Sequence, residues 1–490
     1  MNKSINKKNI IVCLDKNLTG FWLSVAKLLS NNYNIVITTS NSFSKAIVDN
    51  TIPGVCSGIE LEVDFYSDFA KNGMSKEEII KKAKSVEDKY GVTCSMLIAH
   101  HRGIGKGYVF NVDKHPDMLK SWWPHEKKLL EVLKFIFFWE YITDKYRPVL
   151  FLSSLHSKEL SIIARYSKIK YLSLALARYG HRRMWVENEY YQNFDLIKKV
   201  KENVKKYSMR NDKEFINYEL DIQGVFFISK VSYTFIGALK KFLLRLPSEI
   251  ERLVTGYHKK TQGYKFMRWC SPMLRRPFMY RYFRKYGKKT EDLKGYKLFF
   301  SPMHAEPEYN TLSVSPEFSN TMELIAWLSK SIPANGIIVI KEHPMVYGIR
   351  SRQYYDRFRK MGNVVLAHPE ISSLEWIQNS LLVTILTGTV GVEAVYNEKP
   401  VLAFGKYHII NNLPTVRYAN NFDSTNKAVH ELIKLSNNKK LLSVSKQALY
   451  HAQMDISFEM KGLEKLHKRN ILSMDMAAIA VKTLKEKYNI

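Results

Sequence analysis

Short apolar runs alternate along the chain with stretches in which apolar residues recur every three or four positions. Near the N-terminus, residues 9–15 and 34–40 form two such runs, and residues 20–33 between them have helical spacing. The same succession of strand, helix and strand returns over residues 147–177. Strands that alternate with helices are typical of a parallel sheet covered on both faces, so this half predicts an α/β domain.

The pattern starts again in the second half. Five apolar runs, each closed by glycine, proline or histidine, predict strands over residues 295–302, 336–344, 363–369, 381–388 and 399–405. Residues 318–332 and 372–380 between them have helical spacing. We therefore predict an α/β fold with two Rossmann-like domains and a basic, partly amphipathic helical insertion between them.

The length of 490 residues, of which 46% are apolar, suffices for two or three domains. We predict an N-terminal Rossmann-like domain, a basic linker, a C-terminal Rossmann-like domain and a set of C-terminal helices. Their boundaries are 1–230, 231–292, 293–455 and 456–490. In open α/β sheets ligands bind outside the carboxyl ends of the strands, so strand ends are where candidate residues are sought.

Targeting and cysteine patterns point to the cytoplasm. No run approaches the length of a membrane span, since the strongest candidate, residues 135–142, is short and contains Glu140. The basic N-terminus is followed by only a brief apolar run, unlike a secretory signal. The four cysteines are scattered without a CxxC pair, which argues against a disulfide framework and a zinc site.

The net charge of +29 favours anionic partners. Residues 231–290 contain fifteen Lys and Arg but only two Glu. Apolar residues with helical spacing and adjacent cations there predict an amphipathic helix, and we expect residues 239–289 to contact the anionic inner membrane surface. A pair of interdomain helices with solvated charges would look similar. Nucleic acid is not an expected partner, because no nucleic-acid-binding module accompanies the charge.

A glycine-rich turn follows the fourth predicted strand of the second half. It contains Thr387, Gly388, Thr389 and Gly391, and a helix is predicted to start near Glu393. Glycines let a backbone approach a ligand, hydroxyls donate hydrogen bonds and a helix N-terminus favours anions, so the turn predicts a phosphate site. A tight turn with a threonine cap is the alternative. Glu393 could cap the helix locally or accept the two hydroxyls of a ribose.

The second strand of this half ends in His343, which precedes Pro344. A strand-end imidazole can donate to a phosphate oxygen and stabilise a departing nucleoside phosphate. Strand alternation turns Lys341 and His343 the same way and Glu342 the other. Lys341 and Arg350 would reinforce an anion site. The alternative is a surface histidine hydrogen-bonded to a neighbouring loop.

The loop after the first strand of the second half, residues 301–318, carries His304, Glu306 and Glu308. Paired carboxylates beside a histidine can act as general acid and base. An exposed irregular loop would carry the same residue types. These three side chains therefore remain candidates on position alone.

Four segments in order, HAEPE with SPEF, KEHP, TGTVGVEA and EKPVLAFG, resemble the bacterial capsule and surface polysaccharide biosynthesis proteins. That family includes capsular Kdo transferases, which use a CMP-activated sugar. The resemblance is clearest over residues 295–410, with weaker similarity at 100–118 and 174–182. It implies two Rossmann-like domains facing across a cleft, the GT-B arrangement, with the nucleotide sugar held mainly by the C-terminal domain. It also implies that no metal or other cofactor is needed.

Carried over residue by residue, the resemblance places the nucleotide phosphate at His343, with Lys341 nearby. The turn from Thr387 to Gly391 would wrap the phosphate, and Glu393 would bind the ribose. Further substrate-binding candidates are Arg102, Arg178 and His304.

The sequence departs from the family pattern at one position. His101 stands where an acidic residue is expected before an Arg-x-x-Gly-x-Gly-Tyr segment. The catalytic acid or base therefore stays open, with candidates in both halves of the chain: His101, Arg102, Asp113, Glu306 and Glu308.

These observations favour a cytoplasmic glycosyltransferase, peripherally bound to the inner membrane. It would transfer a sugar from a nucleotide-activated donor to a surface polysaccharide or glycolipid. A nucleotide-sugar epimerase or a polyol-phosphate transferase of similar fold is the alternative enzyme. A non-catalytic polysaccharide assembly subunit is the alternative of a different class, and the departure at His101 is its only support.

Overall fold

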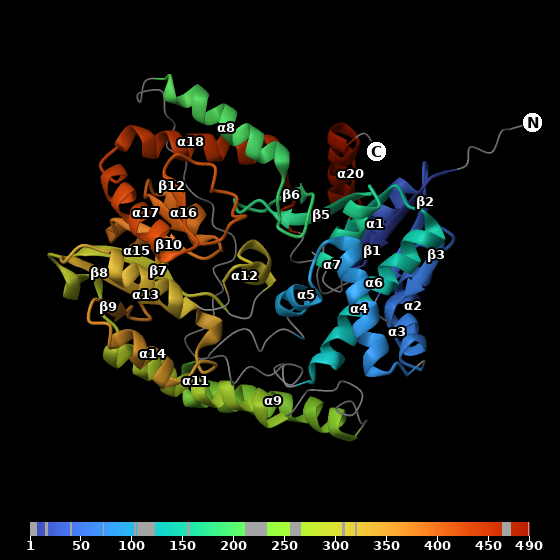
Figure 1. Cartoon of the computed structure of the whole chain (residues 1–490), viewed down its shortest axis with the longest axis horizontal. Helices are drawn as coiled ribbons and strands as arrows, with labels where there is room; N and C mark the ends of the chain where they lie inside the picture. The colour runs from blue at the N-terminus through green and yellow to red at the C-terminus, as the bar shows by residue number, and fades with distance from the viewer. Residues whose placement is uncertain are drawn as a thin grey trace, which may run out of the picture. The chain divides into compact units, whose positions relative to one another are not determined.

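The computed structural model places the chain in two compact units, and each is described by itself (Figure 1). The first unit consists of residues 1–97, 125–195 and 453–490, and the second of residues 98–124 and 196–452. The structure describes residues 7–14, 18–39, 42–71, 73–101, 104, 123–153, 157–210, 233–254, 266–305, 309–318, 321–462, 472–488 and 490.

The first unit is built on a seven-stranded sheet in the order β13-β6-β5-β4-β1-β2-β3. Strands β1 to β5 run parallel, β6 runs antiparallel to β5, and β13 at the edge pairs antiparallel with β6. The order 3-2-1-4-5 of the parallel strands is that of a Rossmann fold. The strands are β1 (Asn9–Cys13), β2 (Asn34–Thr39), β3 (Cys56–Leu61), β4 (Leu150–Ser153), β5 (Lys170–Leu176), β6 (Arg182–Val186) and β13 (Phe458–Glu459).

Helices α1 (Thr19–Leu29) and α20 (Met474–Tyr488) pack on one face of this sheet. Their apolar side chains share one core cluster with strand residues such as Ile10 and Leu152. Trp22 of α1 lies 6.1 Å, ring to ring, from Trp185 of β6. The unit's other helices are α2 (Ser42–Thr51), α3 (Glu62–Lys71), α4 (Lys76–Tyr90), α6 (His125–Tyr146) and α7 (Lys158–Tyr166).

The C-terminal segment differs from the predicted division of the chain. We expected residues 456–490 to form helices of their own, but the structure places β13 and α20 in the first unit. Strand β13 pairs with β6, and Arg182 of β6 donates hydrogen bonds to Ser457. Sequence periodicity identifies such elements but not which distant sheet they join.

The second unit is built on a six-stranded sheet in the order β12-β11-β10-β7-β8-β9, and all its pairings are parallel. Renumbered within the unit, this is 6-5-4-1-2-3, which is the strand order of the Rossmann fold. The order reverses between β7 and β10. The strands are β7 (Lys297–Pro302), β8 (Gly336–Lys341), β9 (Val364–Leu366), β10 (Leu382–Ile385), β11 (Val401–Ala403) and β12 (Val416–Tyr418).

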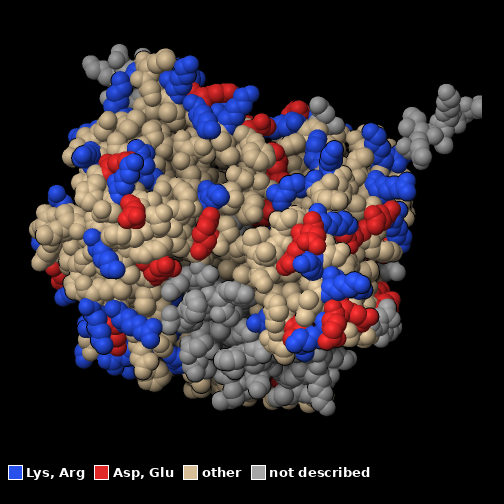
Figure 2. Space-filling model, viewed as in Figure 1, with Lys and Arg blue, Asp and Glu red and all other residues tan. Residues whose placement is uncertain are grey.

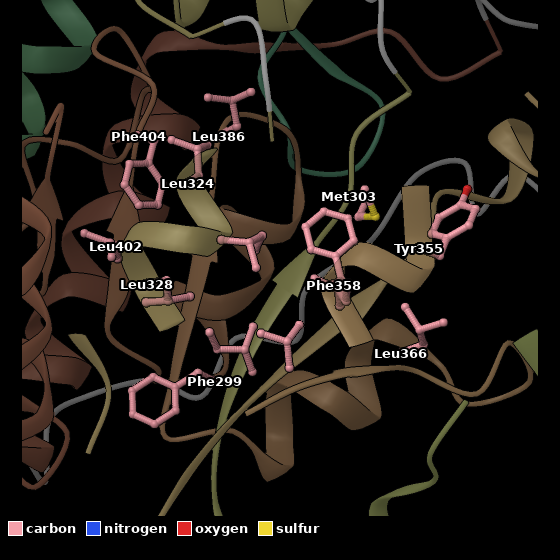
Figure 3. Close-up of a cluster of buried hydrophobic side chains, with 14 of the residues drawn as sticks. Phe299, Met303, Leu324, Leu328, Tyr355, Phe358, Leu366, Leu386, Leu402 and Phe404 are labelled. Atoms are coloured by element: carbon pink, nitrogen blue, oxygen red, sulfur yellow. The ribbon is translucent and has the colours of Figure 1, made fainter. Parts of the chain in front are cut away.

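Helices cover both faces of the second sheet. One face carries the core cluster drawn in Figure 3, in which Phe299 and Leu402 of the sheet meet Leu324, Leu328 and Phe358 of helices. Helices α15 and α16 pack on β7, β10 and β11. The helices around the sheet are α12 (Tyr309–Val314), α13 (Thr321–Ser331), α14 (Arg352–Arg359), α15 (Ser373–Asn379), α16 (Val390–Tyr396) and α17 (Phe422–Leu435).

The predicted α/β class with parallel sheets is therefore confirmed in both units. Two short 3-10 turns, Thr290–Leu293 and Pro344–Val346, belong to the second unit. The chain passes between the units at four places: within α5 (Cys94–His100), just before α6, within α8 (Phe194–Ser208) and within α18 (Lys439–Ile456).

The basic segment forms two long helices that pack on each other, α9 (Phe235–Val254) and α11 (Phe266–Tyr286). Both belong to the second unit. Pro247 lies inside α9, and Pro272 and Pro277 lie inside α11. Across the residues that the structure describes, no helix combines the length and the apolar character needed to cross a bilayer.

Candidate functional site

The candidate site lies at the carboxyl ends of β7, β8 and β10. The strand order reverses between β7 and β10, and ligands of doubly wound sheets bind at such a switch point. His304 follows β7, His343 follows β8, and the turn of residues 386–391 follows β10. Three of the predicted segments are therefore brought to one edge of one sheet by the topology.

His304 lies beneath the turn after β10 and holds it from one side. The side chain is buried, and its Nε2 accepts hydrogen bonds from the backbone N–H groups of Leu386 and Thr387, both at 3.3 Å. A neutral imidazole that accepts through Nε2 carries its proton on Nδ1. In the structure His304 thus positions the turn, and its contact with substrate stays a prediction.

His408 holds the same turn from another side. Its Nε2 lies 2.9 Å from the carbonyl oxygen of Gly388, and its Nδ1 accepts from the N–H of Ile410. His408 is therefore protonated on Nε2, the opposite nitrogen from His304. It follows the predicted strand 399–405 at the same sheet edge. That position could have identified it, but the sequence analysis missed it.

The turn needs glycine where it approaches His304. Gly388 has a φ of +101°, and a side chain added there would reach within 3.4 Å of the His304 ring. The neighbouring Thr387 is buried, and its hydroxyl has no hydrogen-bond partner among the described residues. A buried hydroxyl without a partner costs free energy, which makes Thr387 a candidate polar contact at this edge.

The loop after β8 is fixed by a buried ion pair. Glu342 and Arg350 are fully buried, and Arg350 Nη1 lies 2.7 Å from Glu342 Oε2. The same carboxylate accepts from the Tyr355 hydroxyl at 2.6 Å, and its other oxygen accepts from the His343 N–H. Arg350 also donates to the His304 carbonyl oxygen at 2.8 Å. The network therefore ties the loop after β8 to the loop after β7.

Two expectations about this loop can be compared with the structure. Lys341 and Glu342 point in different directions as predicted, since Glu342 points to α14 and Lys341 to the loop before α15. The prediction that Arg350 reinforces an anion site is wrong, because its guanidinium is buried against Glu342. A charge in a sequence does not reveal its partner, and a buried cation is almost always paired.

His343 is half-buried at the end of β8. Burial lowers the pKa of its imidazole below the ordinary value, and nearby Glu342 opposes this shift. The ring is therefore mostly neutral at neutral pH and can donate through a single N–H. The backbone N–H of His343 donates to the Glu342 carboxylate, which fixes the residue at the end of β8. A phosphate contact was predicted at this position.

Lys341 and Glu393 are both shifted towards their neutral forms by burial. Burial lowers the pKa of Lys341 to about 8, and its ammonium donates to the carbonyl oxygen of Ile371. Burial also raises the pKa of Glu393, while a hydrogen bond from the Thr389 side chain opposes that shift. The N-cap residue Thr389 makes no side-chain hydrogen bond to the backbone of α16, so a cap at this helix start and a ribose contact of Glu393 both remain predictions.

The remaining candidates belong to other elements or lie outside the described residues. Arg102, Asp113, Glu306 and Glu308 lie outside the described residues. His101 is half-buried just after α5 in the second unit. Arg178 belongs to the first unit, in the turn between β5 and β6, with a φ of +60°. In the described part of the chain, no three His, Cys, Asp or Glu side chains form a group that could hold a metal ion.

Comparison with known families gives a match that covers most of the candidate site. Residues 314–443 match the family model described as capsule polysaccharide biosynthesis protein. That stretch includes His343, the turn after β10, Glu393 and His408. The predicted resemblance to capsule polysaccharide biosynthesis proteins is therefore confirmed over these residues. No curated protein matches the chain.

Several solved structures are similar over most of the chain. They include Thermosulfurimonas dismutans KpsC, a beta Kdo 2,7 transferase, at 12% identity over 80% of this chain and 88% of that one, with a TM-score of 0.31. S. aureus MnaA with UDP has 12% identity over 98% and 97%, with a TM-score of 0.27. The UDP-GlcNAc 2-epimerase from Methanocaldococcus jannaschii has 10% identity over 87% and 92%, with a TM-score of 0.24. Similarities this low carry no argument about the site.

Proposed function

We propose that the chain is a glycosyltransferase of capsule or surface polysaccharide biosynthesis. It would transfer a sugar from a nucleotide-activated donor, CMP-linked according to the family resemblance, to a polysaccharide or glycolipid acceptor. One observation carries the proposal: His343 and the histidine-held turn after β10 lie at the same edge of the second sheet, beside its switch point and within the stretch that matches the family.

In the proposed reaction an acceptor hydroxyl attacks the anomeric carbon of the donor sugar. The bond from that carbon to the phosphate oxygen breaks, and negative charge builds up on the leaving nucleoside phosphate. The N–H of the His343 imidazole and the backbone and hydroxyl groups of residues 387–391 would stabilise that charge. The acceptor proton passes to a base that we leave unassigned.

The half-buried setting of this edge supports such a role. Hydrogen bonds to a developing charge are stronger where water is excluded, and donors held in place need no reorganisation during the reaction. Here His304 and His408 fix the turn, and the Glu342–Arg350 pair fixes the loop that presents His343.

We place the reaction at the cytoplasmic face of the inner membrane, where lipid-linked acceptors of surface glycans lie.

The donor class can be tested by thermal stabilisation with CMP, CDP, UDP and GDP. A ligand at a hundred times its Kd stabilises the native state by about 2.7 kcal/mol. We expect the nucleotides of one base to raise the melting temperature more than the others do. Titration calorimetry should then show weaker binding to His343→Ala and Glu393→Ala. Two variants at exposed positions of the same unit, His430→Ala and Glu323→Ala, serve as matched controls.

Assays on the same protein distinguish a transferase from an epimerase and from a non-catalytic assembly subunit. An epimerase would interconvert nucleotide sugars without an acceptor, whereas a transferase would release the nucleotide fastest when an acceptor is added. A non-catalytic assembly subunit should respond to none of the four nucleotides. If both site variants bind nucleotide as tightly as the controls do, the proposed donor site is wrong.

A further inference from the structure

Helix α9 presents a line of apolar side chains to solvent. Its buried and half-buried positions, Ala238, Phe242, Leu246 and Glu249, recur every three or four residues and form one face. At the start of α9, Phe235 packs edge-to-face on Phe278 of α11. The exposed apolar side chains recur with the same spacing on the other side of the helix: Ile236, Leu239, Leu243, Leu244, Ile250 and Val254. These six residues are called the outer face of α9 below.

The exposure of the outer face is unusually high for aliphatic residues. Ile236 is 80% exposed, Leu244 70% and Val254 82%. Seven of the twenty exposed large apolar side chains among the described residues lie on this one helix. Scattered apolar residues on a surface need no explanation, but a contiguous patch marks a contact with another apolar body.

Cations continue round the helix from this face. Lys240, Lys241 and Arg245 are all exposed on α9, and Lys240 is the one next to Leu239, Leu243 and Leu244. Burial lowers the pKa of Lys241, and so do the charges of Arg276 and Arg245. Mutual repulsion of this kind means that an added anion would be attracted to the cluster. On α9 itself the only acids are Glu249, which is buried, and Glu251.

From this combination we infer that the outer face of α9 docks on the surface of an anionic lipid bilayer. The apolar side chains would enter the headgroup and acyl boundary, while the neighbouring cations would meet lipid phosphates. The structure narrows the earlier expectation for residues 239–289 to one face of one helix. This inference does not depend on the proposed glycosyl transfer.

A second copy of the chain and a nucleic acid each fit the outer face of α9 less well than a bilayer does. A second copy of the chain would place the same cationic cluster against itself across a two-fold interface, with a net charge of +29 on each partner. A nucleic acid would use the cations but would leave six exposed aliphatic side chains without an apolar contact. A bilayer with anionic headgroups satisfies the apolar and the charged groups together.

The test is co-sedimentation of the full chain with vesicles. One vesicle preparation contains equal parts of phosphatidylglycerol and phosphatidylcholine, and the other contains phosphatidylcholine alone. The apolar variant is Leu239→Gln, Leu243→Gln and Leu244→Gln, and the charge variant is Lys240→Gln, Lys241→Gln and Arg245→Gln. The matched control changes three aliphatic residues exposed on other helices: Ile80→Gln, Leu374→Gln and Ile479→Gln.

We expect the wild type and the control to bind the anionic vesicles and to bind the neutral ones much more weakly. Binding of the apolar variant should fall at least tenfold, and that of the charge variant about fivefold per cation removed. Salt should weaken binding of the wild type. Circular dichroism verifies that each variant folds, and nucleotide titration without vesicles tests the donor site separately.

Three results would overturn the inference. The apolar variant could bind anionic vesicles as well as the wild type, or the wild type could bind both vesicle preparations equally or not at all. Ultracentrifugation could instead show a wild-type dimer that the apolar variant converts to a monomer, with vesicle binding unchanged. That last result would assign the outer face to a second copy of the chain.

Discussion

At the residue scale, His343 couples the proposed donor site to pH. Burial holds the pKa of its imidazole below the ordinary value of 6.5 in the free protein. A bound phosphate favours the imidazolium form, so the pKa rises in the complex. Between these two pKa values binding takes up a proton. Nucleotide affinity should therefore increase as the pH falls through that window, by at most about tenfold per pH unit.

Titration calorimetry at several pH values between about 5 and 8, in buffers of different ionisation enthalpy, measures this proton uptake directly. His343→Gln keeps an N–H donor but does not titrate, so its affinity should lose most of the pH dependence. His430→Gln, at an exposed position on α17, should keep the dependence of the wild type. An unchanged pH profile in His343→Gln would show that another group takes up the proton.

The sequence predicts where single residues lie when a strand end defines their position. His343 and the turn after β10 lie at one sheet edge as expected, because strand ends of a parallel sheet meet there. The burial of Arg350 against Glu342 and the contact of His408 with the Gly388 carbonyl were not predicted. Which buried polar groups pair is decided by tertiary packing, which periodicity does not report.

At the element scale, the turn between β10 and α16 depends on the backbone freedom of Gly388. An alanine there would be strained at a φ of +101°, and its added carbon would lie in contact with the His304 ring. We expect Gly388→Ala to lower the free energy of unfolding by about 1–3 kcal/mol and to weaken nucleotide binding. Denaturant unfolding and calorimetric titration measure the two effects separately.

Gly362 offers a matched control for this prediction. Its φ of +76° also strains an alanine, but no atom lies within 4 Å of the added carbon, and it precedes β9 away from the proposed site. Gly362→Ala should lose stability while keeping nucleotide affinity. If the two variants lose affinity equally, the turn after β10 has no special role in binding.

The elements themselves were largely predictable. The runs at 295–302, 336–344, 363–369, 381–388 and 399–405 correspond to β7 to β11, because buried parallel strands are nearly continuous apolar segments. Four strands were not predicted: β3, β12, β6 and β13. The last two show why. Strand β6 begins with two arginines and β13 has only two residues, so neither carries a clear apolar period. Such strands form because a neighbouring edge offers hydrogen bonds.

At the scale of the whole molecule, positive charge is not confined to one region. Figure 2 shows lysine and arginine side chains spread over the visible face of both units, with acidic side chains among them. The total of +29 therefore says little about where a partner binds. The informative feature is the coincidence of cations with exposed aliphatic residues on α9, which composition alone does not reveal.

The two units of the fold are interleaved along the chain, and this has a consequence for stability. Helix α20, close to the C-terminal end of the sequence, packs on α1 in the core of the first unit. Leu484 of α20 is fully buried there, whereas Ile479 on the same helix is 42% exposed. We expect Leu484→Ala to destabilise the first unit by about 3 kcal/mol. Ile479→Ala should change stability by no more than about 0.5 kcal/mol.

Hydrogen exchange followed by mass spectrometry can measure this effect for each unit. Peptides that contain β1, in the middle of the first sheet, should exchange faster in Leu484→Ala than in Ile479→Ala. Peptides that contain β10 report on the second unit in the same sample. If β1 exchanges at the wild-type rate in Leu484→Ala, then α20 does not belong to the core of the first unit. The predicted separate C-terminal helices would then describe the chain better than the interleaved arrangement.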